Sequence, residues 1–453
     1  MNCARRFLVR TARTTHLPRR TSLALVVAVT AIATACSSSP PPEEAATAPP
    51  QPHGPITDPA ELEWHRSAPD PAVWGADAST MVFGSTVGAD GTLVAVGVDR
   101  RASPSVAAVF TSRDGIDYSR VDPRDVHTST ATLSAETAMR GVVATPAGLV
   151  AVGFEFAPAG AQVPATTDAA GAGIGATTAA VWRSADARTW DRAATVPADA
   201  LAGALMTRIV ALPVGGFLAL GEEPTTGAGI AWTSPDAATW QRIDPGSGLD
   251  APGRVSFQTA SATSQGILVA GSYRVGDSRR AAVWRSNDAV TWQRVESPAF
   301  ATSQAQEISA LAMLRGTIVA GGASIENGTD AAAIWTSPDG IAWDRVTHDE
   351  DVFGGAGSDA VTVLLPAGDG ILALGRSSPG KLDADAAVWT SKDARNWRRE
   401  PAPTETFGGA NTEEFLTAAI VADRVAATGR SKRADRDTLR YVDTELLLWF
   451  AQE

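Results

Sequence analysis

A serine and an aspartate recur between two aromatic side chains along most of the chain. In the clearest copy, AAIWTSPDGIAWDRV (332–346), Ser337 and Asp339 lie between Trp335 and Trp343. Carboxylates and hydroxyls can do chemistry, but these short side chains can also accept hydrogen bonds from the N–H groups of a tight turn. Packing demands such identity between copies, so we interpret the aspartates as structural. Six positions fit the pattern: Asp114, Asp186, Asp236, Asp288, Asp339 and Asp393.

The residue after each aspartate bears on the type of turn. It is glycine at 115 and 340 and alanine at the other four positions. Alanine disfavours a positive φ, so the sequence predicts a type I-like turn with negative φ. The two tryptophans of a copy are expected to pack together over the turn.

These turns need strands on either side, and the repeat supplies them. The first aromatic residue recurs at intervals of roughly 50 residues, a period typical of propeller blades. An apolar run precedes it and ends at Gly97, Gly153, Gly221, Gly271, Gly321, Gly375 or Gly429. A further apolar segment lies upstream, and a Trp/Tyr-x-Arg segment follows. Each unit thus holds four short strands, which predicts an all-β, seven-bladed propeller of four-stranded blades.

The two ends of the chain are expected to share one blade. The aromatic strand occurs in seven copies, but the Trp/Tyr-x-Arg strand follows only six of them, since the sequence stops at Glu453. Trp64-His65-Arg66 has the missing pattern near the N-terminus. The N-terminal strand should therefore complete the C-terminal blade and leave no free edge.

The Ser-x-Asp pattern resembles the Asp-box, or BNR, repeat of sialidases, sortilin-like receptors and photosystem II assembly factors. Ser337-Pro338-Asp339-Gly340-Ile341-Ala342-Trp343 is one residue shorter than that repeat. The resemblance implies a propeller scaffold, and it implies a ligand site on the face opposite the Asp turns. It does not imply an activity, because such repeats occur in enzymes and in other proteins.

Chemistry beyond the repeat has few candidates. A sialidase-like site needs an arginine cluster and a tyrosine nucleophile, yet Tyr occurs only at 118, 273 and 441 and the arginine motif is missing. The acidic stretches Glu222-Glu223 and Asp349-Glu350-Asp351 are better explained as solvated loop residues than as the two catalytic carboxylates of a glycosidase.

No metal-ligand spacing or cofactor motif occurs. The formal charge of −12 argues against nucleic acid. The sequence therefore predicts a protein that is not an enzyme and has no metal or cofactor.

A binding rim is expected around blades six, seven and one. Trp74, Phe353 and Phe407 each precede glycine at the entry to an inner strand. They could be wedged between blades, or they could form an aromatic ledge at the mouth of the channel. The second alternative makes a binding rim whose charged members are Asp349, Asp351, Arg430 and Arg433, because aromatics beside arginine are typical of binding hot spots.

The N-terminus predicts export and a lipid anchor. A basic stretch leads into the apolar run Leu23–Ala33, which is too short to span a bilayer. Ala33-Thr34-Ala35-Cys36 resembles a bacterial lipobox, which implies lipidation of Cys36. The expected organisation is a signal peptide over 1–35, a lipidated cysteine and flexible tether over 36–60, and the propeller over 61–453.

Together these features predict a monomeric lipoprotein on the outer face of the cell membrane. Its expected function is binding or scaffolding of an unidentified envelope protein through one rim. The alternative is a propeller that binds or hydrolyses glycans in the manner of a sialidase.

Overall fold

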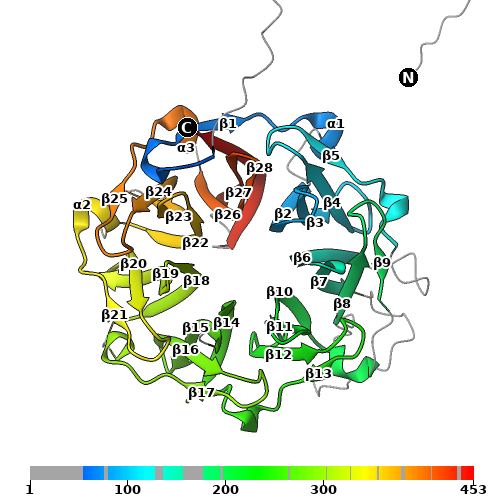
Figure 1. The fold of residues 1–453 in the computed structure, drawn as a ribbon, viewed down its shortest axis with the longest axis horizontal. Coiled ribbons are helices and arrows are strands. Elements are labelled where there is room, and N and C mark those ends of the chain that lie inside the picture. The colour runs from blue at the N-terminus through cyan, green and yellow to red at the C-terminus, as the bar shows by residue number, and fades with distance from the viewer. Residues whose placement is uncertain are drawn as a thin grey trace, which may run out of the picture. The chain divides into compact units, whose positions relative to one another are not determined.

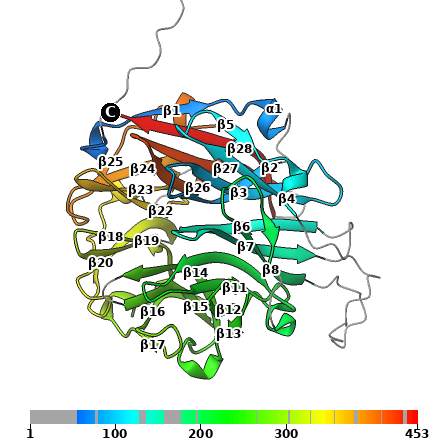
Figure 2. The same ribbon diagram turned by 45° about the vertical axis from the view of Figure 1, so that its right-hand side comes forward.

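The computed structural model describes residues 55–75, 80–127, 136–156, 177–193, 197–263, 266–301, 304–326, 328–354, 357–378, 383–409, 411–435 and 440–453. Within them the strands form seven antiparallel sheets of four. The sheets stand around a common centre as the blades of a propeller (Figures 1 and 2). The predicted seven-bladed propeller is therefore confirmed.

Each blade runs from an inner strand at the centre to an outer strand at the circumference. The inner strands are β2 (Thr80–Val87), β6 (Glu136–Thr145), β10 (Leu205–Ala211), β14 (Arg254–Thr263), β18 (Gln306–Leu314), β22 (Ala360–Ala367) and β26 (Thr412–Val421). The second strands are β3 (Leu93–Asp99), β7 (Gly148–Phe156), β11 (Phe217–Glu222), β15 (Gly266–Val275), β19 (Thr317–Glu326), β23 (Gly370–Ser377) and β27 (Arg424–Asp435).

The third strands carry the first aromatic residue of each repeat. They are β4 (Val106–Ser112), β8 (Thr177–Ser184), β12 (Gly229–Ser234), β16 (Ser278–Ser286), β20 (Thr329–Ser337), β24 (Asp385–Ser391) and β28 (Arg440–Gln452). The outer strands are β5 (Tyr118–Arg120), β9 (Asp191–Arg192), β13 (Gln241–Arg242), β17 (Gln293–Arg294), β21 (Asp344–Arg345), β25 (Arg398–Arg399) and β1 (Glu63–Ser67).

A single helical turn follows each outer strand and leads towards the next blade. These connectors are α1 (Pro71–Trp74), η2 (Pro123–Asp125), η3 (Ala198–Leu201), η4 (Pro245–Ser247), η5 (Pro298–Phe300), α2 (Glu350–Phe353) and α3 (Thr404–Phe407). An Asp or Ser side chain caps five of them, for example Asp70, which accepts the N–H of Ala72 at 2.8 Å. Such caps satisfy N–H groups that a one-turn helix leaves exposed.

The N-terminal strand closes the ring as expected. Strand β1 pairs with β28 from Glu63↔Gln452 to Ser67↔Leu448, so the sheet order of the last blade is β1-β28-β27-β26. Its outer strand comes from the N-terminal end of the chain and its other three strands from the C-terminal end, so both ends are needed to build it.

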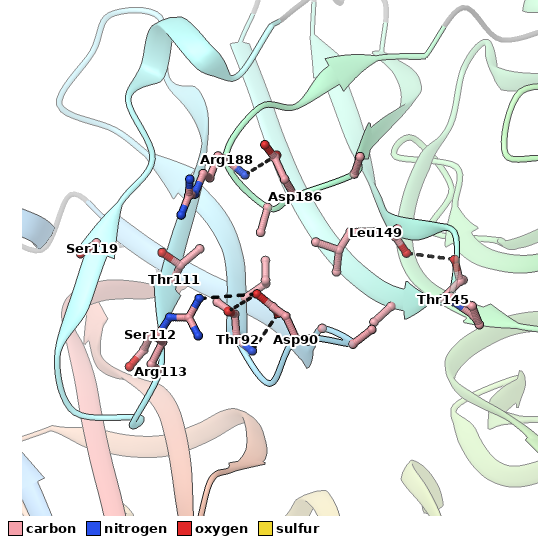
Figure 3. Close-up of a pocket in the computed structure, with 18 of the residues that line it drawn as sticks. Asp90, Thr92, Thr111, Ser112, Arg113, Ser119, Thr145, Leu149, Asp186 and Arg188 are labelled. Carbon is pink, nitrogen blue, oxygen red and sulfur yellow. Dashed lines mark hydrogen bonds and ion pairs between the residues drawn. The ribbon is translucent and has the colours of Figure 1, made fainter.

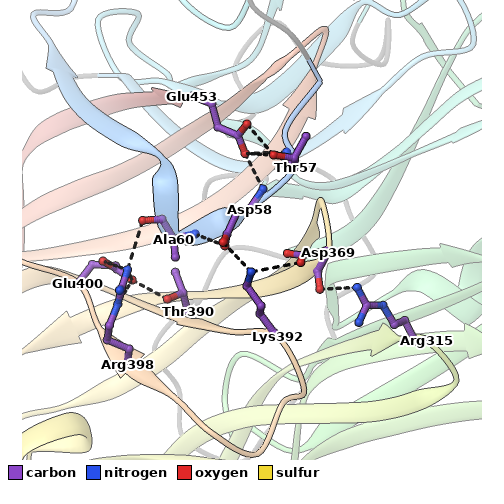
Figure 4. A network of polar contacts seen from close by, with 10 residues as sticks. All are labelled: Thr57, Asp58, Ala60, Arg315, Asp369, Thr390, Lys392, Arg398, Glu400 and Glu453. Carbon is purple, nitrogen blue, oxygen red and sulfur yellow. Dashed lines mark hydrogen bonds and ion pairs between the residues drawn. The ribbon is translucent and has the colours of Figure 1, made fainter.

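The chain before β1 also contacts the ring (Figure 4). Glu453 accepts the backbone N–H groups of Thr57 and Asp58 at 2.6 and 2.5 Å, and Asp58 pairs with Lys392 at 2.7 Å. The short helix η1 (Pro59–Glu61) follows. Residues 57–60, which the sequence assigned to the tether, are thus held against blade 6 and the C-terminus.

The repeated glycine of the second strands has a steric cause. Every inner strand carries a β-bulge at the same register, for example between Val82 and Gly84. A Cβ atom on the facing glycine would overlap a carbonyl oxygen of the inner strand, as at Gly97 and Met81. The other glycines in this position are Gly153, Gly221, Gly271, Gly322, Gly375 and Gly429. In blade five the residue is Gly322 and not Gly321, because Gly322 is the one that faces the bulge.

The core lies between neighbouring blades. Val150 and Val152 of blade 2 pack with Met206 and Trp232 of blade 3, and the other junctions repeat this arrangement. Eight tryptophans are buried to below 2% exposure. Because dense packing fixes each blade against the next, loops at the two ends of the ring are held in place.

Candidate functional site

The six Asp turns connect third and outer strands at one end of the ring. In the turn at Asp339, the carboxylate Oδ1 accepts the N–H groups of Ile341 and Ala342, both at 2.8 Å. Ser337 Oγ accepts the N–H of Gly340 at 2.8 Å, and Trp343 Nε1 donates to the carbonyl of Gly340 at 3.1 Å. The same two N–H bonds to the carboxylate recur at Asp114, Asp186, Asp236, Asp288 and Asp393.

The predicted turn conformation is wrong. Ala187, Ala237, Ala289 and Ala394 have φ between 59° and 62°, in the left-handed region, and the glycines at 115 and 340 also have positive φ, of 78° and 77°. Hydrogen bonds on both sides of the residue explain this conformation. Ala289 N–H donates to Ser286 Oγ at 2.9 Å, and its carbonyl accepts from Trp292 Nε1 at 3.3 Å. These bonds offset a backbone strain of about 1–2 kcal/mol.

A cavity of about 630 Å³ lies at this end of the ring between blades 1 and 2 (Figure 3). Two of its carboxylates are already engaged: Asp90 accepts the N–H and the hydroxyl of Thr92, and Asp186 accepts the N–H groups of Thr189 and Arg188. These bonds lower the pKa values of Asp90 and Asp186. Carboxylates held in this way serve the turns and are poor proton donors.

The three aromatics of the predicted rim are buried and do not form a ledge. Trp74, Phe353 and Phe407 are 3%, 4% and 2% exposed. They end the connectors α1, α2 and α3, which lie at the outer circumference (Figure 1). Trp74 stacks on Phe110 with 4.0 Å between ring centroids. The structure therefore favours the first alternative, an aromatic wedged between blades.

The predicted acidic members of the rim also lie at the circumference. Asp349 caps α2 by accepting the N–H of Asp351 at 3.0 Å. Asp349 lines a hollow of about 720 Å³ beside Phe353 and Trp397, and Asp351 lies in α2. They are therefore separate from the arginines with which the sequence grouped them.

Arg430 belongs to a polar cluster at the end of the ring opposite the Asp turns. Its guanidinium donates to Glu414 Oε1 from Nε at 2.8 Å and from Nη2 at 2.6 Å. Lys432 and Arg376 reach Glu414 Oε2, each at 2.9 Å. We call Arg376, Glu414, Arg430 and Lys432 the blade 6–7 cluster, because Arg376 lies on β23 and the others on β26 and β27.

The cluster places three cations on one buried carboxylate. The side chain of Glu414 is 4% exposed, whereas those of Arg376 and Arg430 are 20% and 27% exposed. Burial alone would raise the pKa of Glu414, but Lys432, Arg430 and Arg376 together lower it to about 2. Glu414 is therefore ionised at neutral pH, and the exposed edge of the cluster is cationic.

Glu413 precedes Glu414 in the sequence, and its pKa is shifted in the opposite direction. It is 1% exposed, and burial raises its pKa to about 7, although a hydrogen bond from Ser431 Oγ at 3.2 Å opposes the shift. Its backbone N–H donates to the carbonyl of Ala384 in blade 6. Adjacent residues of a strand face opposite sides of the sheet, so Glu413 points away from the cluster.

Sequence reasoning found one member of this cluster and missed the other three. Arg433, the second predicted arginine, is exposed on β27 and no contact joins it to Glu414. Arg430 is not the solvated loop charge that the sequence suggested. The alternation Arg430-x-Lys432 opposite Glu414 in the β26–β27 hairpin could have indicated the pair, but Arg376 comes from another blade.

Several predictions meet no test in the described residues. Cys36 and the segments 1–35 and 36–54 lie outside them. In the part of the chain that is described, no group of three or more His, Cys, Asp or Glu side chains could hold a metal ion. None of its short helices has the length and hydrophobicity of a membrane span.

No protein-family model and no curated protein matches the chain. Among solved structures, it is similar to a PL25 ulvan lyase bound to -[GlcA(1-4)Rha3S]-, at 11% identity and a TM-score of 0.52, over 83% of this chain and 94% of that one. A Trypanosoma rangeli sialidase in complex with the inhibitor DANA matches at 12% identity and a TM-score of 0.40, over 83% and 54%.

A Bombyx mori GH32 β-fructofuranosidase mutant in complex with sucrose matches at 11% identity and a TM-score of 0.33. It covers 51% of this chain, which spans 60% of that enzyme's length. At these identities the likeness establishes the propeller fold alone, and with it the scaffold that the resemblance implied.

The expectation that the protein is not an enzyme has to be corrected. A solved structure that shares its fold over most of both chains is a polysaccharide lyase, so this scaffold does occur in an enzyme. The expectation rested on missing sialidase motifs, and such motifs do not define the wider group of propeller enzymes.

Proposed function

We propose that this protein is a glycan-active propeller and that the blade 6–7 cluster recognises an anionic glycan. The observation that carries the proposal is the convergence of Arg376, Arg430 and Lys432 on Glu414, with both guanidiniums partly exposed. Guanidinium groups bind carboxylate and sulfate groups through paired hydrogen bonds. On a chain with a formal charge of −12, this local cationic surface stands out.

The position of the cluster supports the proposal. Glu414 lies two residues before Leu416, which lines the central channel, and the cluster is at the end of the ring away from the Asp turns. Loops and strand ends held by a rigid scaffold are where binding usually resides. The similar ulvan lyase is bound to a glucuronic acid-containing ligand, which suggests acidic polysaccharides as the first substrates to assay.

The experiment compares Arg430→Gln with Arg433→Gln. Both changes remove one positive charge from β27, but only Arg430 contacts Glu414. Retention on ulvan, polygalacturonate and neutral pullulan is measured by affinity electrophoresis, and reducing ends are measured in the same mixtures. We expect the native protein to be retained by the two acidic polymers and Arg430→Gln to weaken that retention at least about ten-fold. Equal behaviour of the two variants, or equal retention by pullulan, contradicts the proposal.

We further propose that the chain is exported and anchored to the outer face of the membrane by a lipid on Cys36, with residues 1–35 as the signal peptide. The support is the apolar run Leu23–Ala33 followed by a lipobox-like tripeptide. Cys36→Ala should abolish labelling with radioactive palmitate and release the protein from the membrane fraction. Persistent labelling of that variant would exclude Cys36 as the anchor.

A further inference from the structure

A small cavity of about 200 Å³ lies at the centre of the ring, between the inner strands of all seven blades. Its walls are the residues at and just after the bulges, including Phe83, Arg140, Arg208, Thr259 and Ser309. The bulges aim these side chains inwards, and residues so aimed are often functional.

Two arginines line this cavity, and none of its lining residues is Asp or Glu. The guanidinium of Arg140 lies over the ring of Phe83, with 3.9 Å between Cζ and the ring centroid. Arg208 Nη1 donates to the carbonyl of Thr207 at 2.9 Å. The chemistry of the cavity is therefore cationic, although the protein as a whole is acidic.

Arg208 is surrounded by the inner strands but is still exposed to the water of the channel. Its surroundings lower its pKa through desolvation, and no carboxylate opposes the shift. An arginine keeps its charge under such conditions, since its unperturbed pKa is far above neutrality. A negative partner in the channel would stabilise this charge.

The repeat does not require an arginine in this place. Position 208 corresponds to Gly84 and Gly141 in the two preceding blades and to Thr259 and Thr417 in blades 4 and 7, each directly after its bulge. Neighbouring inner strands approach closely at those glycines, where a Cβ on Gly84 would lie 3.1 Å from Gly141 Cα. The guanidinium is thus specific to blade 3 and has no role in packing that the other blades share.

We propose that the central cavity binds an oxyanion, either a free sulfate or phosphate or the carboxylate of a sugar acid, through Arg208 and Arg140. The hydroxyl-bearing residues Thr259 and Ser309 line the same cavity and offer further donors. This site is separate from the blade 6–7 cluster, and its existence does not depend on which glycan that cluster recognises.

The test measures thermal stabilisation of the full chain by sodium sulfate, sodium phosphate and sodium glucuronate, each against sodium chloride at equal ionic strength. A ligand that binds only the folded state stabilises it by RT ln(1 + c/Kd) at a free ligand concentration c, so the melting temperature rises with the logarithm of ligand concentration above the dissociation constant. We expect this rise for the native protein and a dissociation constant at least about ten-fold higher for Arg208→Thr, which introduces the residue found at this register in blades 4 and 7. Arg274→Thr, an exposed change of equal charge on β15, should bind as the native protein does.

The three ligands distinguish the source of the oxyanion. An Arg208-dependent rise in melting temperature with sulfate or phosphate assigns the site to a free ion, and such a rise with glucuronate alone assigns it to a sugar acid. No rise above sodium chloride with any of them, or an equal rise in the native protein, Arg208→Thr and Arg274→Thr, overturns the proposal. If Arg208→Thr does not fold, anomalous scattering from selenate-soaked crystals of the native protein decides: a peak beside Arg208 supports the site, and an empty channel refutes it. Loss of polysaccharide retention in Arg430→Gln would leave this result unchanged.

Discussion

Carboxylates at the two ends of the ring are held by different kinds of donor. Asp339 accepts two backbone N–H groups of its own turn, and the same geometry returns in five other blades. Glu414 accepts only side-chain donors among its described bonds, and these come from two blades. Almost every residue type supplies a backbone N–H donor, whereas three cations around one carboxylate require a basic residue at three particular positions.

This difference separates structural acids from candidate functional ones. The Asp turns are local, since each bond spans two or three residues, so they can repeat without reference to the rest of the ring. The blade 6–7 cluster is not local, because it joins Arg376 of blade 6 to three residues on two strands of blade 7. Residues that must be brought together by the whole fold are the better candidates for recognition.

The largest expected effect comes from opening the ring. A chain beginning at Asp70 lacks β1 and exposes the edge of β28. We expect a loss on the order of 5 kcal/mol or more in unfolding free energy, comparable with the total for many domains. Urea unfolding is compared with that of a chain beginning at Pro55. Equal midpoints would contradict the role of β1 in holding the blade that carries the cluster.

Glu414→Gln tests the cluster itself. The change leaves three cations together without their carboxylate, which should cost about 3–5 kcal/mol. Glu445→Gln is the control, because that side chain is 55% exposed. The lowered pKa of Glu414 also predicts that its contribution is complete above about pH 4.5 and is lost as the pH falls through about 2. Acid unfolding of the variant should lack that contribution.

Much of the fold was predictable from the sequence because its signals are local and repeated. The Ser-x-Asp turns, the aromatic positions and Trp64-His65-Arg66 gave the number of blades and the closure. The left-handed alanines were not predictable from intrinsic preference, because at Ala289 it is overridden by two hydrogen bonds, one donated to Ser286 Oγ and one accepted from Trp292 Nε1. Likewise, the sequence showed the glycines of the second strands but not the bulges that require them.

The candidate site was less accessible to sequence reasoning. The sequence left open whether Trp74, Phe353 and Phe407 are wedged between blades or exposed, because their burial depends on connectors whose path the sequence does not reveal. Arg430 was identified, but its partner Glu414 and its neighbour Arg376 lie on other strands. Pairing between blades is a property of the ring, so no short motif carries it.

The stability of the folded protein should also depend on pH through Glu413, whose pKa is shifted in the opposite direction to that of Glu414. Its pKa is raised to about 7, so the stability that it contributes is complete below about pH 4.5 and is lost as the pH rises through 7. Glu413→Gln cannot ionise and should remove this loss. Melting temperatures between pH 5 and 8 of both proteins should therefore diverge as the pH rises, with the variant the more stable. Parallel curves would show that Glu413 has an ordinary pKa.

At the opposite end, Asp339→Ala should cost less than Glu414→Gln. It removes two hydrogen bonds to backbone N–H groups that water can replace in part, so we expect a loss of about 1–2 kcal/mol. Retention on acidic polysaccharides should be unchanged at temperatures where the variant is folded. Weakened retention with unchanged stability would place recognition at the Asp-turn end of the ring.

The smallest expected effects concern the residue after the aspartate. Ala289 is 1% exposed with φ of 60°, so Ala289→Gly relieves about 1–2 kcal/mol of strain and loses a buried methyl group worth about 0.8 kcal/mol. Glycine also gives the unfolded chain more freedom, which opposes the gain. These contributions should cancel to within about 0.5 kcal/mol in urea unfolding. Gly340→Ala adds the strain and brings a methyl group to 3.1 Å from Leu268 Cδ2, so it should destabilise by about 1 kcal/mol. If both changes are neutral, the hydrogen bonds of the Ser and Asp side chains offset the backbone strain completely. If Ala289→Gly costs more than Gly340→Ala, the buried methyl group of Ala289 contributes more than the backbone strain. The turns would then be held mainly by packing between blades.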